Sequence, residues 1–260
     1  MAGSFLNLVI IRLPRMLYNT WQQEAERGGK LSAYNLFIPR SHCVHCKHTI
    51  AWFDNIPLLG FLWLRGHCRY CHHNISLRYP FIELLTALLS IGVAIRFGLS
   101  PLTLAALSLT WALIALTFID IDHTLLPDNI TLPFLWLGLF VNLFTVFQNA
   151  ESAILGAILG YLFLWTVYWI FKWITHKEGM GYGDFKLLAM LAAWLGWQAL
   201  PSIILISSFV GSVVGICLIL FQGRDKLKPI PFGPFLAMSG FITLLWGSEL
   251  NHLYFTFFNI

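Results

Sequence analysis

The sequence predicts an all-α integral membrane protein, a polytopic bundle of about seven or eight transmembrane helices with a small cytoplasmic cysteine-rich insertion. Of the 260 residues, 58% are hydrophobic and only 11% are charged, whereas about a quarter of the residues of a soluble domain are charged. The mean hydropathy is +0.72, and long apolar stretches follow one another from residue 80 onward. No long β-alternation competes with them, so the predicted bundle is helical.

Seven apolar stretches come close to the length of a membrane span, because about 20 helical residues, each rising about 1.5 Å, cross about 30 Å of hydrocarbon. Pro80, Pro101 and Pro201 mark the starts of three of them, since the N–H that proline lacks is unpaired in a first helical turn. The seven stretches lie near residues 80–97, 101–121, 130–148, 153–174, 185–200, 201–221 and 231–248.

The apolar run GSFLNLVII at residues 3–11 is too short to cross a bilayer. It also lacks the basic region and the cleavage site of a signal peptide. We expect residues 1–12 to be part of a first membrane helix that begins upstream of this sequence. An interfacial anchor is the alternative.

The basic residues predict the orientation of the bundle. Nine of the 16 Lys and Arg residues fall between Arg12 and Arg78. With spans alternating from residue 80, only Arg96 lies on the opposite side, and the positive-inside rule makes the shared side the cytoplasm. This distribution accounts for the formal net charge of +4 without a nucleic-acid partner. The later basic residues on or near the shared side are Lys172, Lys177, Lys186, Arg224, Lys226 and Lys228.

Composition divides the chain into regions. Residues 13–79 are polar and rich in Cys and His, residues 80–248 are of membrane type, and residues 249–260 form a short tail. The first of these regions is dense in Pro, Gly and other turn residues, so we expect a small cytoplasmic module between the first two spans. No internal repeat is evident.

Four cysteines form two pairs, Cys43 with Cys46 and Cys68 with Cys71, separated by 21 residues. This spacing is close to that of zinc ribbons, in which two such pairs complete a tetrahedral site. A closed four-thiolate shell has no open position for water, so the zinc would be structural. The alternative is two disulfides, which a reducing cytoplasm disfavours.

Histidines surround the two cysteine pairs, and a fifth cysteine lies far from them in the sequence. Six histidines lie close to the two pairs and could act as ligands, but four thiolates already suffice: His42, His45, His48, His67, His72 and His73. Cys217 stands alone in an apolar run, and we expect a small buried hydrophobic residue there.

Acidic residues are scarce, with 12 in the chain, and an ionisable group costs about 2.5–3.5 kcal/mol at the centre of a membrane. Their positions are therefore informative. Asp120, Asp122 and Asp128 lie in FIDIDHTLLPD, directly after an apolar stretch, and Asp184 lies in GMGYGDFKLLAM, directly before one. The predicted topology brings all four to the cytoplasmic boundary of the membrane, where they could meet.

A pair of neighbouring carboxylates can hydrolyse a peptide without a metal, because one holds a proton while the other activates a water. Gly181 and Gly183 beside Asp184 would let a substrate backbone approach closely. For Asp122 and Asp128 a helix cap or a solvated position is the favoured interpretation, and contact with substrate is the alternative.

The segment Gly181-Tyr182-Gly183-Asp184 resembles the GxGD signature of membrane aspartyl proteases, a class that includes presenilin and the type IV prepilin peptidases. The wider pattern resembles the prepilin peptidase family over nearly the whole chain. It consists of the two cysteine pairs together with GSFLNLVIIRLPR, RYPFIELLTA at 79–88, IDIDHTLLPD at 119–128 and PIPFGPFLA at 229–237.

This resemblance implies that Asp120, which opens the DxDH block, and Asp184 are the catalytic pair. It also implies a multi-pass protein of the bacterial inner membrane that removes the basic leader of type IV prepilins and type II secretion pseudopilins on the cytoplasmic side. Many members then methylate the new N-terminal residue with S-adenosylmethionine, which here is implied by the resemblance alone. Anionic membrane lipid is expected to position the basic leader.

Three other functions remain open. A presenilin-like protease would cut other membrane segments. A proton-coupled transporter would carry carboxylates across the membrane depth and inverted repeats. A scaffold with a metal-bound assembly module would tolerate loss of both aspartates but not loss of the cysteines.

Overall fold

The structure is a computed structural model that describes residues 1–26, 35–222 and 230–258, with side chains described for 1–25, 35–221 and 230–250. It divides into two compact units, Met1–Ile95 and Arg96–Ile260. The described residues are helices joined by loops and contain no strand beyond two isolated bridges in the cysteine module. The predicted all-α class is confirmed.

Each of the seven predicted apolar stretches forms a helix. Among the described helices, four segments are long and apolar enough to cross a membrane, namely α3, α4, α6 and Trp197–Phe221, which covers α8 except for its last residue. The larger predicted number of spans stays a prediction. The helices are α3 (Arg78–Phe97), α4 (Pro101–His123), α5 (Asp128–Leu143), α6 (Ala150–Thr175), α7 (Tyr182–Leu195), α8 (Leu200–Gln222) and α9 (Gly233–Phe258).

Helix α7 ends at Leu195, earlier than the predicted end of that stretch at residue 200. Gly196 has a φ of 81°, a positive value that glycine adopts without strain, and this conformation stops the helix. A short 3₁₀ turn, η1 (Trp197–Ala199), then leads into α8. The helix boundary therefore lies at Gly196 and not at Pro201.

The first helix, α1 (Ala2–Glu26), continues past residue 12 and past Pro14 into the polar sequence that follows. Three hydrogen bonds tie its start and the module to α3. The Ser4 hydroxyl donates to Glu83 Oε1 (2.6 Å), the Asn7 amide donates to the Tyr79 carbonyl (3.1 Å), and the Leu58 N–H donates to Glu83 Oε2 (2.9 Å). Within the first unit, Glu83 therefore joins α1, the module and α3.

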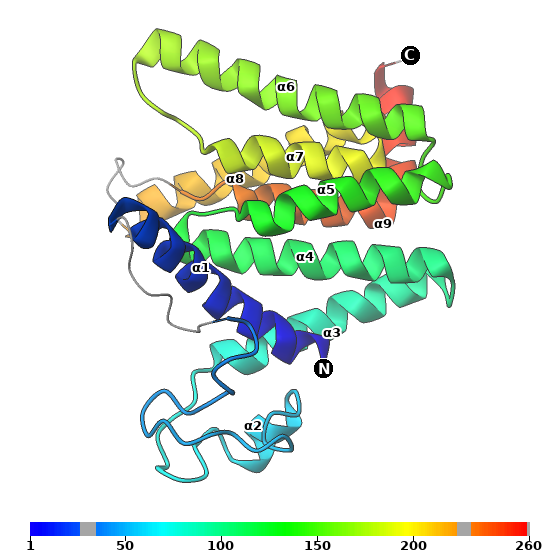
Figure 1. Ribbon diagram of the computed structural model, residues 1–260. Coiled ribbons are helices and arrows are strands. Elements are labelled where there is room, and N and C mark those ends of the chain that lie inside the picture. The colour runs from blue at the N-terminus through cyan, green and yellow to red at the C-terminus, as the bar shows by residue number, and fades with distance from the viewer. Residues whose placement is uncertain (27–34, 223–229, 259–260) are drawn as a thin grey trace. The chain divides into compact units, whose positions relative to one another are not determined.

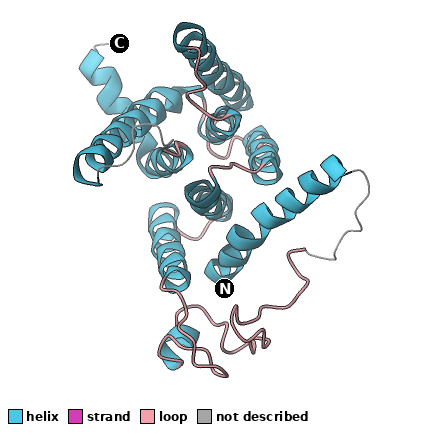
Figure 2. Ribbon diagram, turned by 90° about the vertical axis from the view of Figure 1, so that its left-hand side faces the viewer, coloured by secondary structure: helices cyan, strands magenta, loops and turns pink. Residues whose placement is uncertain are grey.

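In the second unit the long helices run roughly along one direction and are seen end-on in Figure 2. Helix α7 is packed by α5, α6 and α9, and every residue from Asp184 to Leu195 except Lys186 is buried. Glycines let α6 approach it closely, since a Cβ on Gly156 would lie 2.7 Å from the Ala192 carbonyl oxygen. Because its neighbours cover α7 on all sides, the helix is apolar around most of its circumference.

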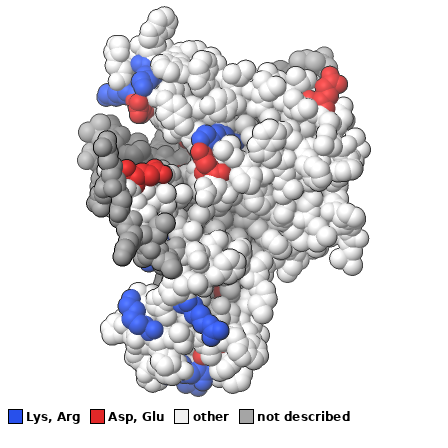
Figure 3. Space-filling view, in the orientation of Figure 1, with Lys and Arg blue, Asp and Glu red and all other residues white. Residues whose placement is uncertain are grey.

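On the face shown in Figure 3, charged side chains occupy little of the described surface, most of which is neither acidic nor basic. Of the residues that support a cytoplasmic orientation, five lie outside the described residues, namely Arg27, Lys30, Arg224, Lys226 and Lys228. The orientation stays a prediction. Cys217, expected to be buried, is exposed on α8. Apolar side chains such as Phe209 and Leu220 are exposed on the same helix, so in a membrane protein an apolar sequence context does not identify the interior.

Candidate active site and metal centre

Asp120 lies in the last turn of α4 and is buried, with 5% of its surface exposed. Its Oδ2 accepts a hydrogen bond of 3.0 Å from the N–H of Gly233, the first residue of α9. A Cβ on Gly233 would lie only 2.5 Å from that oxygen. The absence of a side chain at Gly233 is therefore what lets the start of α9 approach the carboxylate.

Asp184 lies in the first turn of α7 and is equally buried, at 6% exposure. Its Oδ2 accepts from the Gly181 N–H at 3.2 Å, and its own N–H donates to the Gly181 carbonyl at 3.2 Å. This reciprocal pair caps the helix. Each of the two buried aspartates is thus held through one oxygen by the backbone N–H of a glycine.

Leu126 shows how the two aspartates come together. This buried side chain lies against both glycine segments, because a Cβ on Gly183 would be 2.7 Å from Leu126 Cβ and one on Gly233 would be 3.1 Å from Leu126 Cδ2. The end of α4 and the starts of α7 and α9 therefore meet, and the described residues donate no further hydrogen bond to either carboxylate.

The four cysteines of the module converge on one point. Their Sγ atoms all lie within 4.8 Å of one another, with Cys43 to Cys71 at 3.7 Å and Cys46 to Cys68 at 4.0 Å. A tetrahedral ion with bonds of about 2.3 Å requires sulfur–sulfur distances of about 3.8 Å. All four cysteines are free, so the structure does not contain the alternative disulfides. The cluster could hold a metal ion.

The two halves of this cluster repeat each other, although no repeat was evident from the sequence. In residues 40–50 and again in 65–75, the N–H of the first cysteine donates to the carbonyl five residues later, at 2.9 Å in both. The N–H of the fourth residue after that cysteine donates to the carbonyl of the cysteine, at 3.0 Å in both. Only six of the eleven residues are identical between the two segments. So short a repeat becomes apparent only because both segments form the same backbone hydrogen bonds.

The histidines pack around the cysteine cluster. His45 stacks on His73 with ring centroids 4.7 Å apart, and His48 lies 3.6 Å from the ring centroid of Tyr70. These two ring pairs occupy equivalent places in the repeat. No histidine belongs to the metal-binding group found among the described residues.

Comparison with known proteins identifies relatives along nearly the whole chain. The model for the bacterial peptidase A24 N-terminal domain matches residues 1–97, and the model for the type IV leader peptidase family matches residues 107–216. A prepilin leader peptidase/N-methyltransferase of Aeromonas hydrophila is 57% identical over 99% of this chain and 91% of its own. This chain belongs to the type IV leader peptidase family.

Other members with the same description are similarly close. The protein of Stutzerimonas stutzeri is 52% identical and that of Pseudomonas aeruginosa is 50% identical, each over 99% of this chain and 91% of its own. No solved structure matches the chain. The resemblance identified in the sequence is confirmed, and neither the transporter nor the presenilin-like alternative is favoured.

In this leader peptidase family member, the other two candidate acids are not buried as Asp120 and Asp184 are. Asp122 and Asp128 are both exposed. Asp128 begins α5, and both of its carboxylate oxygens accept from Lys186 Nζ at 2.7 Å. The structure therefore brings together Asp120 and Asp184 out of the four candidates.

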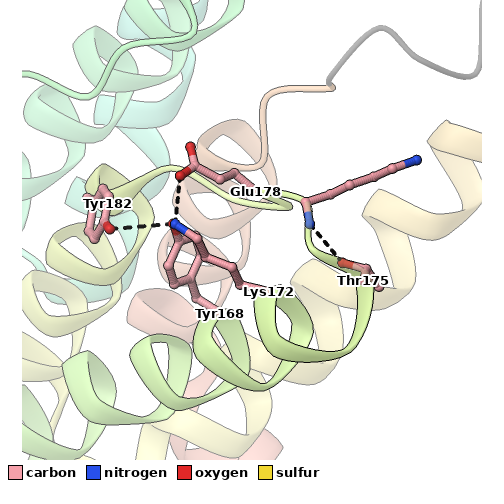
Figure 4. A network of polar contacts seen from close by, with 6 residues as sticks. Tyr168, Lys172, Thr175, Glu178 and Tyr182 are labelled. Atoms are coloured by element: carbon pink, nitrogen blue, oxygen red, sulfur yellow. Dashed lines mark hydrogen bonds and ion pairs between the residues drawn. The ribbon is translucent and has the colours of Figure 1, made fainter.

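A polar network beside Asp184 was not predicted from the sequence (Figure 4). Lys172 Nζ donates to Glu178 Oε1 at 2.8 Å and to the Tyr168 hydroxyl at 3.2 Å. The Tyr182 hydroxyl donates to the same Tyr168 oxygen at 3.4 Å. One signal was available, because Tyr168 and Lys172 are spaced i and i+4, which places them on the same face of a helix.

Proposed function

We propose that this protein cleaves the leader peptide of type IV prepilins and type II secretion pseudopilins at the cytoplasmic boundary of the bacterial inner membrane. In this proposal Asp120 and Asp184 form the catalytic dyad. The buried aspartate pair carries the proposal, because each carboxylate is fixed by a glycine N–H, in a chain 57% identical to a prepilin leader peptidase/N-methyltransferase.

The chemistry requires the two carboxylates to share one proton. The ionised aspartate takes a proton from a water molecule as the oxygen of that water attacks the scissile carbonyl carbon. The protonated member gives its proton to the departing amine as the carbon–nitrogen bond breaks. Either aspartate can act first as the base, because the proton belongs to the pair.

The substrate would enter from the membrane. The apolar helix of a prepilin would rest in lipid against the bundle, with its leader reaching the aspartates. Gly181, Gly183, Asp122 and Asp128 are the proposed contacts for the substrate chain near the scissile bond. Anionic lipid would attract the basic leader.

Two further groups belong to the proposal. Zinc is the proposed metal of the cysteine cluster, because the sulfur distances suit a tetrahedral four-thiolate site. A four-coordinate zinc there would cross-link the module. We also propose methylation of the new N-terminal amine with S-adenosylmethionine, which the name of the relatives supports. No residue of this chain is assigned to that step.

Asparagine substitution tests the dyad. Asp120→Asn and Asp184→Asn keep the side-chain shape but remove the acid–base function, so each should lower leader cleavage at least about 100-fold. Mass spectrometry of a prepilin incubated with the purified protein in lipid reports both leader loss and an added methyl group.

The matched control is Glu249→Gln, because Glu249 is an exposed acid of α9 that pairs with Arg96. This variant should cleave normally. A generic signal peptide should stay intact with the wild-type protein. Normal cleavage by either aspartate variant would show that the dyad is wrong, and cleavage of the signal peptide would show that the substrate class is wrong.

A further inference from the structure

The loop at residues 176–181, between α6 and α7, ends at the residue that holds Asp184. His176 closes α6 in a left-handed conformation, with its N–H on the Lys172 carbonyl at 2.9 Å. At the other end, the Gly181 N–H donates to the Asp184 carboxylate. Any shift of this loop therefore reaches the carboxylate through one hydrogen bond.

The network of Figure 4 ties the middle of this loop and the start of α7 to α6. Lys172 bonds Glu178 within the loop, and Tyr168 bonds Tyr182, the first residue of α7. Both connections meet at the Tyr168 hydroxyl, which also accepts from Lys172. A single buried tyrosine on α6 therefore anchors the segment before Asp184.

Aromatic packing makes this anchor rigid. Tyr168 is 2% exposed, and its ring lies 5.3 Å from that of Tyr182 and 5.6 Å from that of the buried Phe185. The ammonium of Lys172 lies 5.4 Å from the centre of the Tyr168 ring, within the range of a cation–π contact. The rings fix where the Tyr168 hydroxyl points, and the hydroxyl fixes Tyr182.

The ion pair of this network contributes little to the stability of the whole fold. The side chain of Glu178 is 68% exposed and that of Lys172 is 35% exposed, and exposed pairs are weakened by water and salt. The Lys172 ammonium nevertheless lowers the pKa of Glu178 below its ordinary value. The pair is therefore intact above the ordinary range of a glutamate and is lost as the pH falls through the lowered pKa.

We propose that Lys172, Glu178 and Tyr168 are positioning residues, which hold the loop and Tyr182 so that Asp184 keeps a fixed direction toward the substrate. The inference rests on the proposed catalytic role of Asp184. It assigns a function to a network that lies beside the dyad and does not itself touch the reacting atoms.

Kinetics of ion-pair variants test the proposal. Lys172→Met and Glu178→Gln each remove the pair with little change in volume. A displacement of about 1 Å at a reacting group can lower a rate about 100-fold, so we expect kcat for prepilin cleavage to fall roughly tenfold or more. KM should stay within about twofold, because neither variant removes a group that is proposed to contact the substrate.

Two controls make the result specific. Exchanging the charges, with Lys172→Glu and Glu178→Lys together, should recover part of kcat because it rebuilds an ion pair. Arg96→Met and Glu249→Gln break a comparable exposed pair at 2.5 Å in the same unit and should leave kcat unchanged. An unchanged kcat in Lys172→Met would overturn the proposal, as would an equal loss in the Arg96 and Glu249 variants. A raised KM with normal kcat would instead assign Glu178 to leader binding.

Hydrogen exchange separates this proposal from the proposed function. In lipid nanodiscs, amides of residues 178–184 should exchange faster in Glu178→Gln than in wild type, while those of residues 186–195 should not change. Asp184→Asn reports only on the catalytic role. Normal cleavage by Asp184→Asn would remove the proposed function, whereas unchanged exchange at 178–184 in Glu178→Gln would remove the positioning role.

Discussion

Glycine residues at two helix starts hold the two buried aspartates through backbone N–H groups. Gly233 and Gly181 each donate to one carboxylate oxygen, at 3.0 Å and 3.2 Å. A backbone donor at a helix start adds the favourable end of the helix dipole to the hydrogen bond. The second oxygen of each carboxylate accepts no hydrogen bond from the described residues, as the proposed dyad requires. The geometry of the site therefore depends on the two glycines as well as on the two aspartates.

Gly233→Ala tests whether the close approach of Gly233 to the Asp120 carboxylate matters for cleavage. The added Cβ would lie 2.5 Å from Asp120 Oδ2 and 3.1 Å from Leu126 Cδ2, so the carboxylate or α9 must move. We expect leader cleavage to fall at least about 100-fold, because a displacement of about 1 Å can have that effect. The measurement is cleavage of a prepilin by the purified variant.

Gly215→Ala on α8 is the matched control, because its Cβ would meet only Ile230 Cδ1 at an ordinary 3.6 Å. It should cleave at the wild-type rate. If Gly233→Ala cleaved as well as Gly215→Ala, the contact between Gly233 and Asp120 would have no role in the reaction.

Among the helices, Asn142 of α5 binds the carboxyl-terminal end of α7 through hydrogen bonds. Its Nδ2 donates to the carbonyls of Ala193 and Trp194 at 2.9 Å and 3.0 Å. Its Oδ1 accepts from the N–H groups of Phe147 and Gln148, both at 3.1 Å. The last carbonyls of a helix have no partner within the helix, so this buried amide of α5 supplies one. It keeps the central helix in register with its neighbour.

Asn142→Leu should destabilise the second unit strongly. The leucine fills a similar volume but strands buried backbone groups, each at a cost of about 1–3 kcal/mol. We expect a lower thermal unfolding midpoint in detergent.

Asn149→Ala provides the comparison, because Asn149 supplies one N-cap hydrogen bond to Ser152 (2.9 Å), and losing such a cap costs about 1 kcal/mol. An Asn142→Leu midpoint at or above that of Asn149→Ala would contradict the assigned role.

At the scale of the whole molecule, the two units rest on different interactions. The second unit buries apolar side chains around α7, whereas the exposed module holds four sulfurs within 4.8 Å of one another. A module of this size buries too little apolar surface to fold firmly by itself, so a metal ion would supply much of its stability.

Metal analysis tests this view. The purified protein should carry about one zinc per chain, since four thiolates complete one tetrahedral shell. Cys43→Ser and Cys68→Ser should lower the zinc content and speed hydrogen exchange across residues 40–75. Residues 184–195 of α7, in the other unit, should keep their protection.

Cys217→Ser, which removes the one described cysteine outside the cluster, should leave the zinc content unchanged. Metal-free protein with two disulfides would rule out both the ligand set and the proposed cytoplasmic placement.

The sequence by itself predicted what depends on neighbouring residues along the chain. Long apolar stretches predicted each helix from α3 to α9, because hydrophobicity and length are local properties. The spacing of the cysteine pairs predicted their cluster, because two residues between thiolates suit one ion. The motif around Asp184 indicated a class of membrane aspartyl proteases, and the wider pattern of motifs along the chain indicated the family, which the comparisons confirm.

The tertiary structure decided what depends on contacts between distant segments. It buried Asp120 and Asp184 and left Asp122 and Asp128 exposed, although all four are the same residue type. It also brought Gly233, which follows Asp120 by 113 positions, to that carboxylate, and no local pattern encodes such a pairing. The physical reason is that burial and hydrogen-bond partners are set by how the helices pack, whereas helix formation and metal-ligand spacing are set within a few residues.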